Sequence, residues 1–151
     1  MMLAAVNDTP FNIVKILHIL AFMVALAPAF VNPLLERQMA ANDSSAWKRT
    51  LSYASQNSMK IYGSALIVGG LLGFALAGMS DGLYEMSQTW LSLSAVLWVG
   101  MNGVLHALII PSEKAVVGGD ASAQRKLDIG GAAMTLLMVV VLYLMVFQPG
   151  A

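Results

Sequence analysis

Four long runs of apolar residues, separated by polar segments, divide the chain. They cover about residues 11–31, 60–79, 89–110 and 129–147. The hydrocarbon core of a bilayer is about 30 Å thick, and a helix of about 20 apolar residues spans it. The pattern therefore predicts an all-α integral membrane protein, a four-helix bundle that forms a single transmembrane domain over residues 1–151.

Prolines set the expected ends of these helices. Pro28 lies inside the first run, where its missing N–H group favours a kink. Asn32-Pro33 and Pro111 are expected to end the first and third helices, because proline disrupts helical hydrogen bonding. The polar connection of residues 34–58 is longer than bare loops usually are, so part of it should extend helix one or two beyond the bilayer.

Composition and charge support a membrane location and narrow the range of partners. Hydrophobic residues make up 58% of the chain and charged residues only 11%, against about 25% charged residues in soluble domains. The formal net charge of zero argues against nucleic acid as a partner. Basic residues gather in the connections after the first and third runs, which predicts that both termini lie outside a bacterial-type inner membrane.

His18 is the main candidate for a functional residue, because it lies within the first apolar run, one turn after Lys15. Its depth from the outer side is roughly 10 Å. Ionisable residues at such depth are functional hypotheses by default. Three interpretations remain open: an axial ligand to haem b, a group in a proton relay, and a neutral histidine hydrogen-bonded to a neighbouring helix.

His106 is a weaker candidate, although Trp98, Asn102 and His106 share one face of the third helix. Its predicted position is about 15 Å farther along the membrane normal than that of His18, which opposes a single haem held by both histidines. We expect His106 near the inner interface, facing Asn102 or loop carbonyls. The sequence contains no catalytic triad, HExxH motif or phosphate loop, so catalytic residues and enzymatic activity stay unassigned.

Small residues recur every four positions in the second helix, at Ala65, Gly69, Gly73 and Ala77. Such a stripe lets another helix approach closely in a membrane. We expect it to pack against another helix of the same chain, with helix three through Gly103 or helix four as the favoured partner. A homodimer contact is the alternative.

The first helix resembles that of a known group of membrane proteins. Lys15-Ile16-Leu17-His18, followed by Pro33, is similar to the first helix of HemJ-type protoporphyrinogen oxidases and of the related CopD-like proteins. Ser92 and Ser94 stand where HemJ-type proteins usually carry a histidine and a lysine, so the uncharacterised four-helix relatives are more similar. The resemblance implies the four-helix fold and a haem-linked role for the matching histidine.

Two functional hypotheses follow. The first is a haem-b-binding or redox-linked membrane protein with His18 as the iron ligand and His106 as a weaker candidate. The second is a non-enzymatic accessory or assembly subunit of a larger membrane complex. The lipid bilayer is the expected partner in both, with a homo-oligomer or a larger complex as further expectations.

Overall fold

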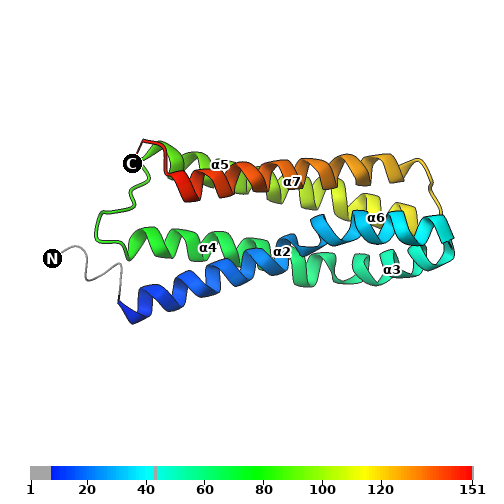
Figure 1. Ribbon diagram of the computed structural model, residues 1–151, viewed down its shortest axis with the longest axis horizontal. Coiled ribbons are helices and arrows are strands. Elements are labelled where there is room, and N and C mark those ends of the chain that lie inside the picture. The colour runs from blue at the N-terminus through cyan, green and yellow to red at the C-terminus, as the bar shows by residue number, and fades with distance from the viewer. Residues whose placement is uncertain (1–7, 43, 151) are drawn as a thin grey trace.

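The computed structural model describes residues 8–42 and 44–150, and these residues form helices joined by short connections, with no strand among them (Figure 1). The elements in chain order are α2 (Thr9–Asn42), α3 (Ser44–Asn57), the π-helical turn η1 (Ser58–Gly63), α4 (Ser64–Gly78), α5 (Thr89–Val104), the π-helical turn η2 (Leu105–Ile109), α6 (Ile110–Val117) and α7 (Ala123–Phe147).

Four helical segments are long and apolar enough to cross a membrane. They are Thr9–Met39, Ser45–Gly78, Thr89–Val117 and Ala123–Phe147. At most 28% of the most apolar part of any segment is buried inside the molecule, so most of its residues are exposed or half-buried. Outward apolar side chains fit a lipid environment, and the prediction of four apolar helices that suggest a multi-pass membrane protein is confirmed.

The predicted helix ends were wrong at two prolines. The first helix continues through Pro28 and Pro33 to Asn42, and the third continues through Pro111 to Val117. At Pro111 the wide turn η2 precedes the proline, and the N–H group of Ile110 donates to the carbonyl of Leu105, five residues earlier. A local π-helical adjustment of this kind lets a membrane helix accommodate proline without ending.

Two other boundaries also differ from the prediction. The second helical segment begins near Ser45 rather than near residue 60, because α3 and η1 lead directly into α4. The fourth begins at Ala123 rather than at residue 129. The expectation that the connection of residues 34–58 is partly helical is therefore confirmed. At 1.5 Å per residue, the 34 residues of the second segment span about 50 Å, longer than the hydrocarbon core.

The helices pack as two pairs, α2 with α4 and α5 with α7, and these pairs have the most extensive contacts in the bundle. A central apolar cluster, which includes Leu26, Leu66, Met101 and Met134, joins the two pairs. Helix α2 begins and α7 ends at the same end of the bundle (Figure 1), which we call the termini end. At the opposite end, α3 packs against α2 and α6, and α6 against α7.

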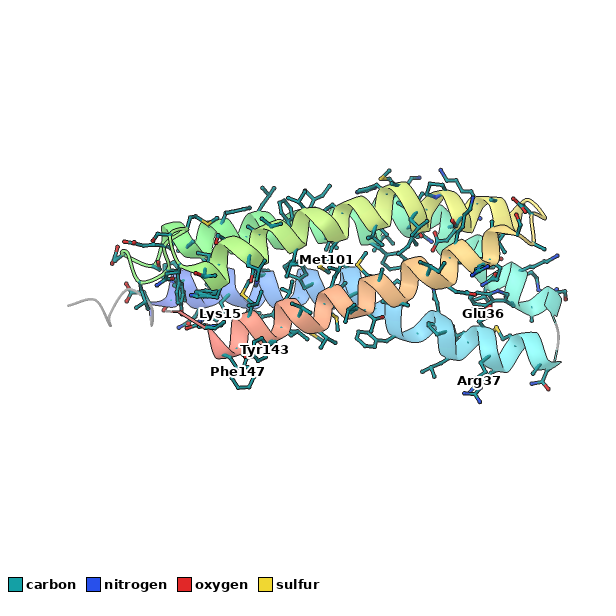
Figure 2. The ribbon with its side chains drawn as sticks, turned by 90° about the horizontal axis from the view of Figure 1, so that it is seen from above. Lys15, Glu36, Arg37, Met101, Tyr143 and Phe147 are labelled. Atoms are coloured by element: carbon teal, nitrogen blue, oxygen red, sulfur yellow. The ribbon has the colours of Figure 1, made fainter. Side chains whose placement is uncertain are left out.

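Charged side chains mark this opposite end. Glu36 and Arg37 lie there, far from Lys15, Tyr143 and Phe147 at the termini end (Figure 2). The second helical segment is longer than a bilayer core, so one end of the bundle would extend past the hydrocarbon of a membrane that it spans. The concentration of charge favours the α3–α6 end for that extension.

Candidate functional site

His18 lies on α2 against the glycine-bearing face of α4. Its Nδ1 atom is 2.7 Å from the carbonyl oxygen of Gly69. A Cβ atom at Gly73 would lie 3.0 Å from Cε1 of the imidazole, closer than side chains normally approach. Glycine at position 73 therefore lets the ring reach the backbone of the neighbouring helix.

The partner of Nδ1 fixes which ring nitrogen carries the proton. A backbone carbonyl only accepts hydrogen bonds, so Nδ1 must donate the proton to Gly69. In neutral histidine the other nitrogen, Nε2, then keeps a free lone pair. The contact is the helix–helix hydrogen bond expected of a structural histidine, and it also leaves one nitrogen available as a ligand.

The small-residue stripe contacts α2, not the helices that we expected. A Cβ atom at Gly69 would lie 2.9 Å from the ring of Phe22, and Gly73 faces His18, so the partner helix is α2 of the same chain. No described heavy atom lies within 4 Å of a Cβ atom built on Gly103. The expected contact through Gly103 was therefore wrong, because that residue faces outward.

A second close approach involves Gly70, which the four-residue spacing did not single out. Nε1 of Trp98 on α5 donates to the carbonyl of Leu66, one turn before Gly70, over 2.8 Å. The indole also packs edge-on against Phe74, with ring centroids 5.8 Å apart. A Cβ atom at Gly70 would overlap the indole ring. Two carbonyl groups of α4 thus accept hydrogen bonds from ring N–H groups on adjoining helices, one from His18 of α2 and one from Trp98 of α5.

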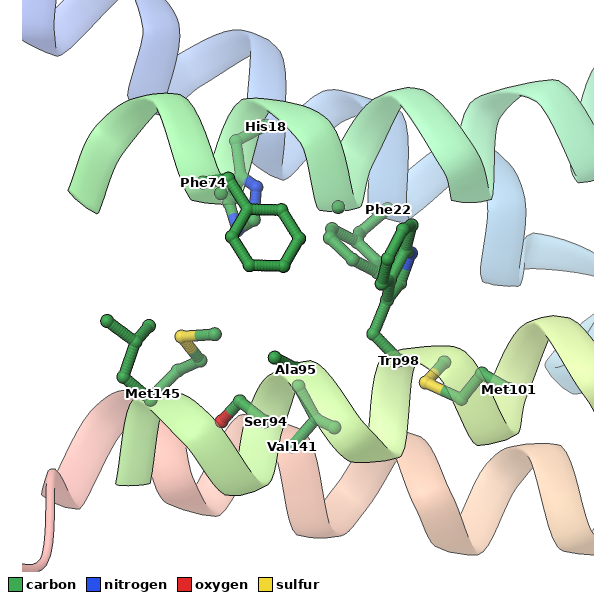
Figure 3. Close-up of a pocket in the computed structure, with 12 residues that line it drawn as sticks. His18, Phe22, Phe74, Ser94, Ala95, Trp98, Met101, Val141 and Met145 are labelled. Carbon is green, nitrogen blue, oxygen red and sulfur yellow. The ribbon is translucent and has the colours of Figure 1, made fainter. Parts of the chain in front are cut away.

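Two cavities border His18. The smaller has a volume of about 40 Å³ and lies between α2, α4, α5 and α7. Figure 3 shows its lining by His18 and Phe22 above and by Ser94, Met101 and Met145 below. Its volume is enough for water but not for a cofactor.

The larger cavity, which we call the α2–α7 cavity, has a volume of about 880 Å³. Its lining includes exposed residues of both helices, such as Met23 on α2 and Leu142 on α7, so it opens to the outside between them. Lys15 and His18 are basic residues of its lining, and most other lining side chains are apolar. The Nζ atom of Lys15 lies 4.9 Å from the centroid of the Phe11 ring.

His106 lies elsewhere along the bundle. Its Cε1 atom would lie 3.1 Å from a Cβ atom on Gly63, whereas His18 faces Gly73. Ten residues of helix separate the two glycines, or about 15 Å, which agrees with separate sites for the histidines. Asn102 donates to the carbonyl of Trp98, and its Oδ1 atom is buried without a partner in the described structure, so the expected contact with His106 is not a hydrogen bond.

The donor set determines which cofactors this region can accept. No group of three or more His, Cys, Asp or Glu side chains that could hold a metal ion occurs in the described part of the chain. An iron that brings its own porphyrin nitrogens needs only one or two protein ligands, and His18 can supply one. Comparison with protein-family models, curated proteins and solved structures found no match to the chain.

Proposed function

We propose that the protein binds haem b in the α2–α7 cavity, with Nε2 of His18 as the iron ligand. The observation that carries the proposal is the hydrogen bond from Nδ1 of His18 to the carbonyl of Gly69. Metal-binding histidines almost always donate their other ring N–H group in this way, because the bond fixes the tautomer and the ring orientation.

The size and chemistry of the cavity also support the proposal. Its volume of about 880 Å³ falls within the range of about 300–1,000 Å³ for ligand and cofactor sites. Apolar side chains would cover the porphyrin faces, and Lys15 offers a cation for a porphyrin carboxylate. When bound, haem supplies one-electron redox chemistry, while the chain holds and orients it and limits access of water. The similarity of the first helix to HemJ-type proteins agrees with this role.

A visible spectrum of the purified protein tests the proposal. After expression with added haem, the wild-type protein should show a Soret band, and His18→Ala should lose it. His106→Ala is the matched control and should keep the band, because His106 faces Gly63 rather than the cavity. Free imidazole added to His18→Ala should restore the band by replacing the missing ligand.

Two results would contradict the proposal. One is a Soret band that survives in His18→Ala, provided that circular dichroism shows an intact fold. The other is a wild-type protein without any band after haem supply, which would favour the accessory or assembly subunit. The test therefore distinguishes a haem-binding protein from an accessory or assembly subunit that binds no haem.

The membrane orientation belongs to the same proposal. We infer a bacterial-type inner membrane with both termini outside, supported by the basic residues of the α3–α6 end. The chain has no cysteine, so single-cysteine variants report cleanly. An impermeant thiol reagent applied to intact cells should label Met86→Cys, in the connection between α4 and α5, and should leave Ala121→Cys unlabelled. The reverse labelling pattern would show the opposite orientation, with both termini inside.

A further inference from the structure

Glu113 is a buried carboxyl group at the α3–α6 end, away from His18. Only 2% of its surface is exposed, and Ser58, its hydrogen-bond partner, is 1% exposed. The bond joins the Ser58 hydroxyl to Oε2 of Glu113 across 55 positions of sequence. It connects the start of η1 with α6, two elements that are far apart in sequence but adjacent in the folded chain.

The hydrogen bonds of Ser58 indicate whether Glu113 carries a proton. Oγ of Ser58 lies within hydrogen-bonding distance of two acceptors, Oε2 of Glu113 and the carbonyl oxygen of Ala54 at 2.9 Å. A hydroxyl has one proton but can also accept. Serine in a helix often donates to the carbonyl four residues before it, which is the Ala54 contact. Both contacts are full hydrogen bonds if the carboxyl group carries a proton and donates it to Ser58.

Charges on the packed elements do not compensate an ionised Glu113. In the described structure Glu113 forms no ion pair, and the one hydrogen bond of its side chain is to Ser58. The half-buried titratable groups on these elements are His106 on η2 and Tyr62 on η1. The exposed ones are Lys48, Arg49 and Tyr53 on α3, Lys60 on η1, Lys114 on α6, and Arg125, Lys126, Asp128 and Tyr143 on α7. Burial of an uncompensated carboxylate is costly.

We propose that Glu113 is a proton-binding site that is occupied near neutral pH. In the occupied state the carboxyl group donates to Oγ of Ser58, and the Ser58 hydroxyl donates to the carbonyl of Ala54. Ser58 lies eleven positions before Gly69, the partner of His18, or about 16 Å along the helix. The site is therefore separate from the α2–α7 cavity and does not depend on haem binding.

Release of the proton to water changes the hydrogen bonds of the adjoining helices. The ionised carboxylate can only accept, so the Ser58 hydroxyl turns from Ala54 to Glu113. Ser58 opens η1, and Glu113 follows η2 by four residues. The two π-helical turns contact each other, and such turns are frequent at functional sites. Proton binding at Glu113 thus changes the hydrogen bonds beside η1 and η2, the two turns where the helical geometry is irregular.

Infrared spectroscopy of the full-length protein tests the proposal. At neutral pH the difference spectrum, wild type minus Glu113→Gln, should contain the C=O stretching band of one protonated carboxylic acid. This band should shift in D2O. Ser58→Ala should keep this band and move it to higher frequency, because the carboxyl group loses its acceptor. The matched control Glu85→Gln removes an exposed carboxylate and should leave the band unchanged. A band of equal strength in the wild-type protein and in Glu113→Gln would refute the proposal. The absence of this band from the wild-type spectrum would also refute it.

Stability measurements give an independent readout. An unfolded chain ionises glutamate near about pH 4.3, so at neutral pH the folded state holds one proton more than the unfolded state. The unfolding equilibrium constant of the wild-type protein should then rise by about tenfold per pH unit relative to that of Glu113→Gln. Glutamine keeps a donor for Ser58, so this variant should fold. Parallel pH profiles for the two proteins would exclude a bound proton.

Discussion

Replacement of Gly70 by alanine tests the close packing of α5 on α4. A Cβ atom at this position would lie closer than 3.0 Å to the indole ring of Trp98. The ring is rigid, and its Nε1 donates to the carbonyl of Leu66 while its edge meets Phe74. Accommodation of one methyl group therefore requires the indole to move and the hydrogen bond to lengthen or break.

The expected magnitude combines three effects. Overpacking a well-packed site costs about 1–3 kcal/mol, and loss of the hydrogen bond costs about 0.5–1.5 kcal/mol. Alanine stabilises a helix relative to glycine by about 0.5–1 kcal/mol, which offsets part of the loss. We expect Gly70→Ala to lower the free energy of unfolding by roughly 0.5–4 kcal/mol.

Unfolding in a denaturing detergent, followed by far-ultraviolet circular dichroism, measures this change. Gly103→Ala is the matched control, since no described atom lies within 4 Å of a Cβ atom there, and it should be neutral or stabilising. In a double-mutant cycle, Gly70→Ala should cost much less in a Trp98→Ala background. Equal stabilities of Gly70→Ala and Gly103→Ala, or strictly additive effects in the cycle, would refute the assigned contact.

Two further predictions concern single hydrogen bonds. Trp98→Phe keeps an aromatic ring but removes the donor to Leu66, so the free energy of unfolding should fall by about 0.5–1.5 kcal/mol in the same detergent assay; an unchanged value would argue against the bond. In the connection before α7, hydrogen bonds from the side chain and backbone of Ser122 lower the pKa of Asp120. Ser122→Ala removes the hydroxyl donor and should raise that pKa, which a carboxyl NMR titration measures, whereas a lower pKa would contradict this cause.

The four long apolar helices could be predicted from the sequence, although their ends could not, because long apolar runs form a simple pattern. An apolar run in hydrocarbon has to satisfy its own backbone hydrogen bonds, and a helix does this within one segment. The same simplicity hides the partner of each helix, since apolar side chains cover both its packed face and its exposed face. Gly103 and Gly69 look equivalent in sequence, yet only Gly69 lies against another helix.

Prediction of the candidate site was partial for the same reason. His18 stood out because an ionisable residue is rare in an apolar run, and the structure gives it the Gly69 carbonyl as a partner. The partner could not be predicted, because a backbone carbonyl has no signature in sequence. The same holds for Trp98. Its indole N–H group needs an acceptor, but the identity of that acceptor, the Leu66 carbonyl, depends on α4 lying beside α5.

Pro111 links the wrong helix boundary to the burial of Glu113. In a regular helix, residues three and four positions apart share a face. Across η2 the buried Leu105 is followed by buried Ile110, five positions later, so the π-helical turn adds one residue to the repeat. The added residue shifts the register of α6, and Glu113, three positions after Ile110, joins the buried face. The proline that was expected to end the helix instead precedes the carboxyl group that α6 directs toward Ser58.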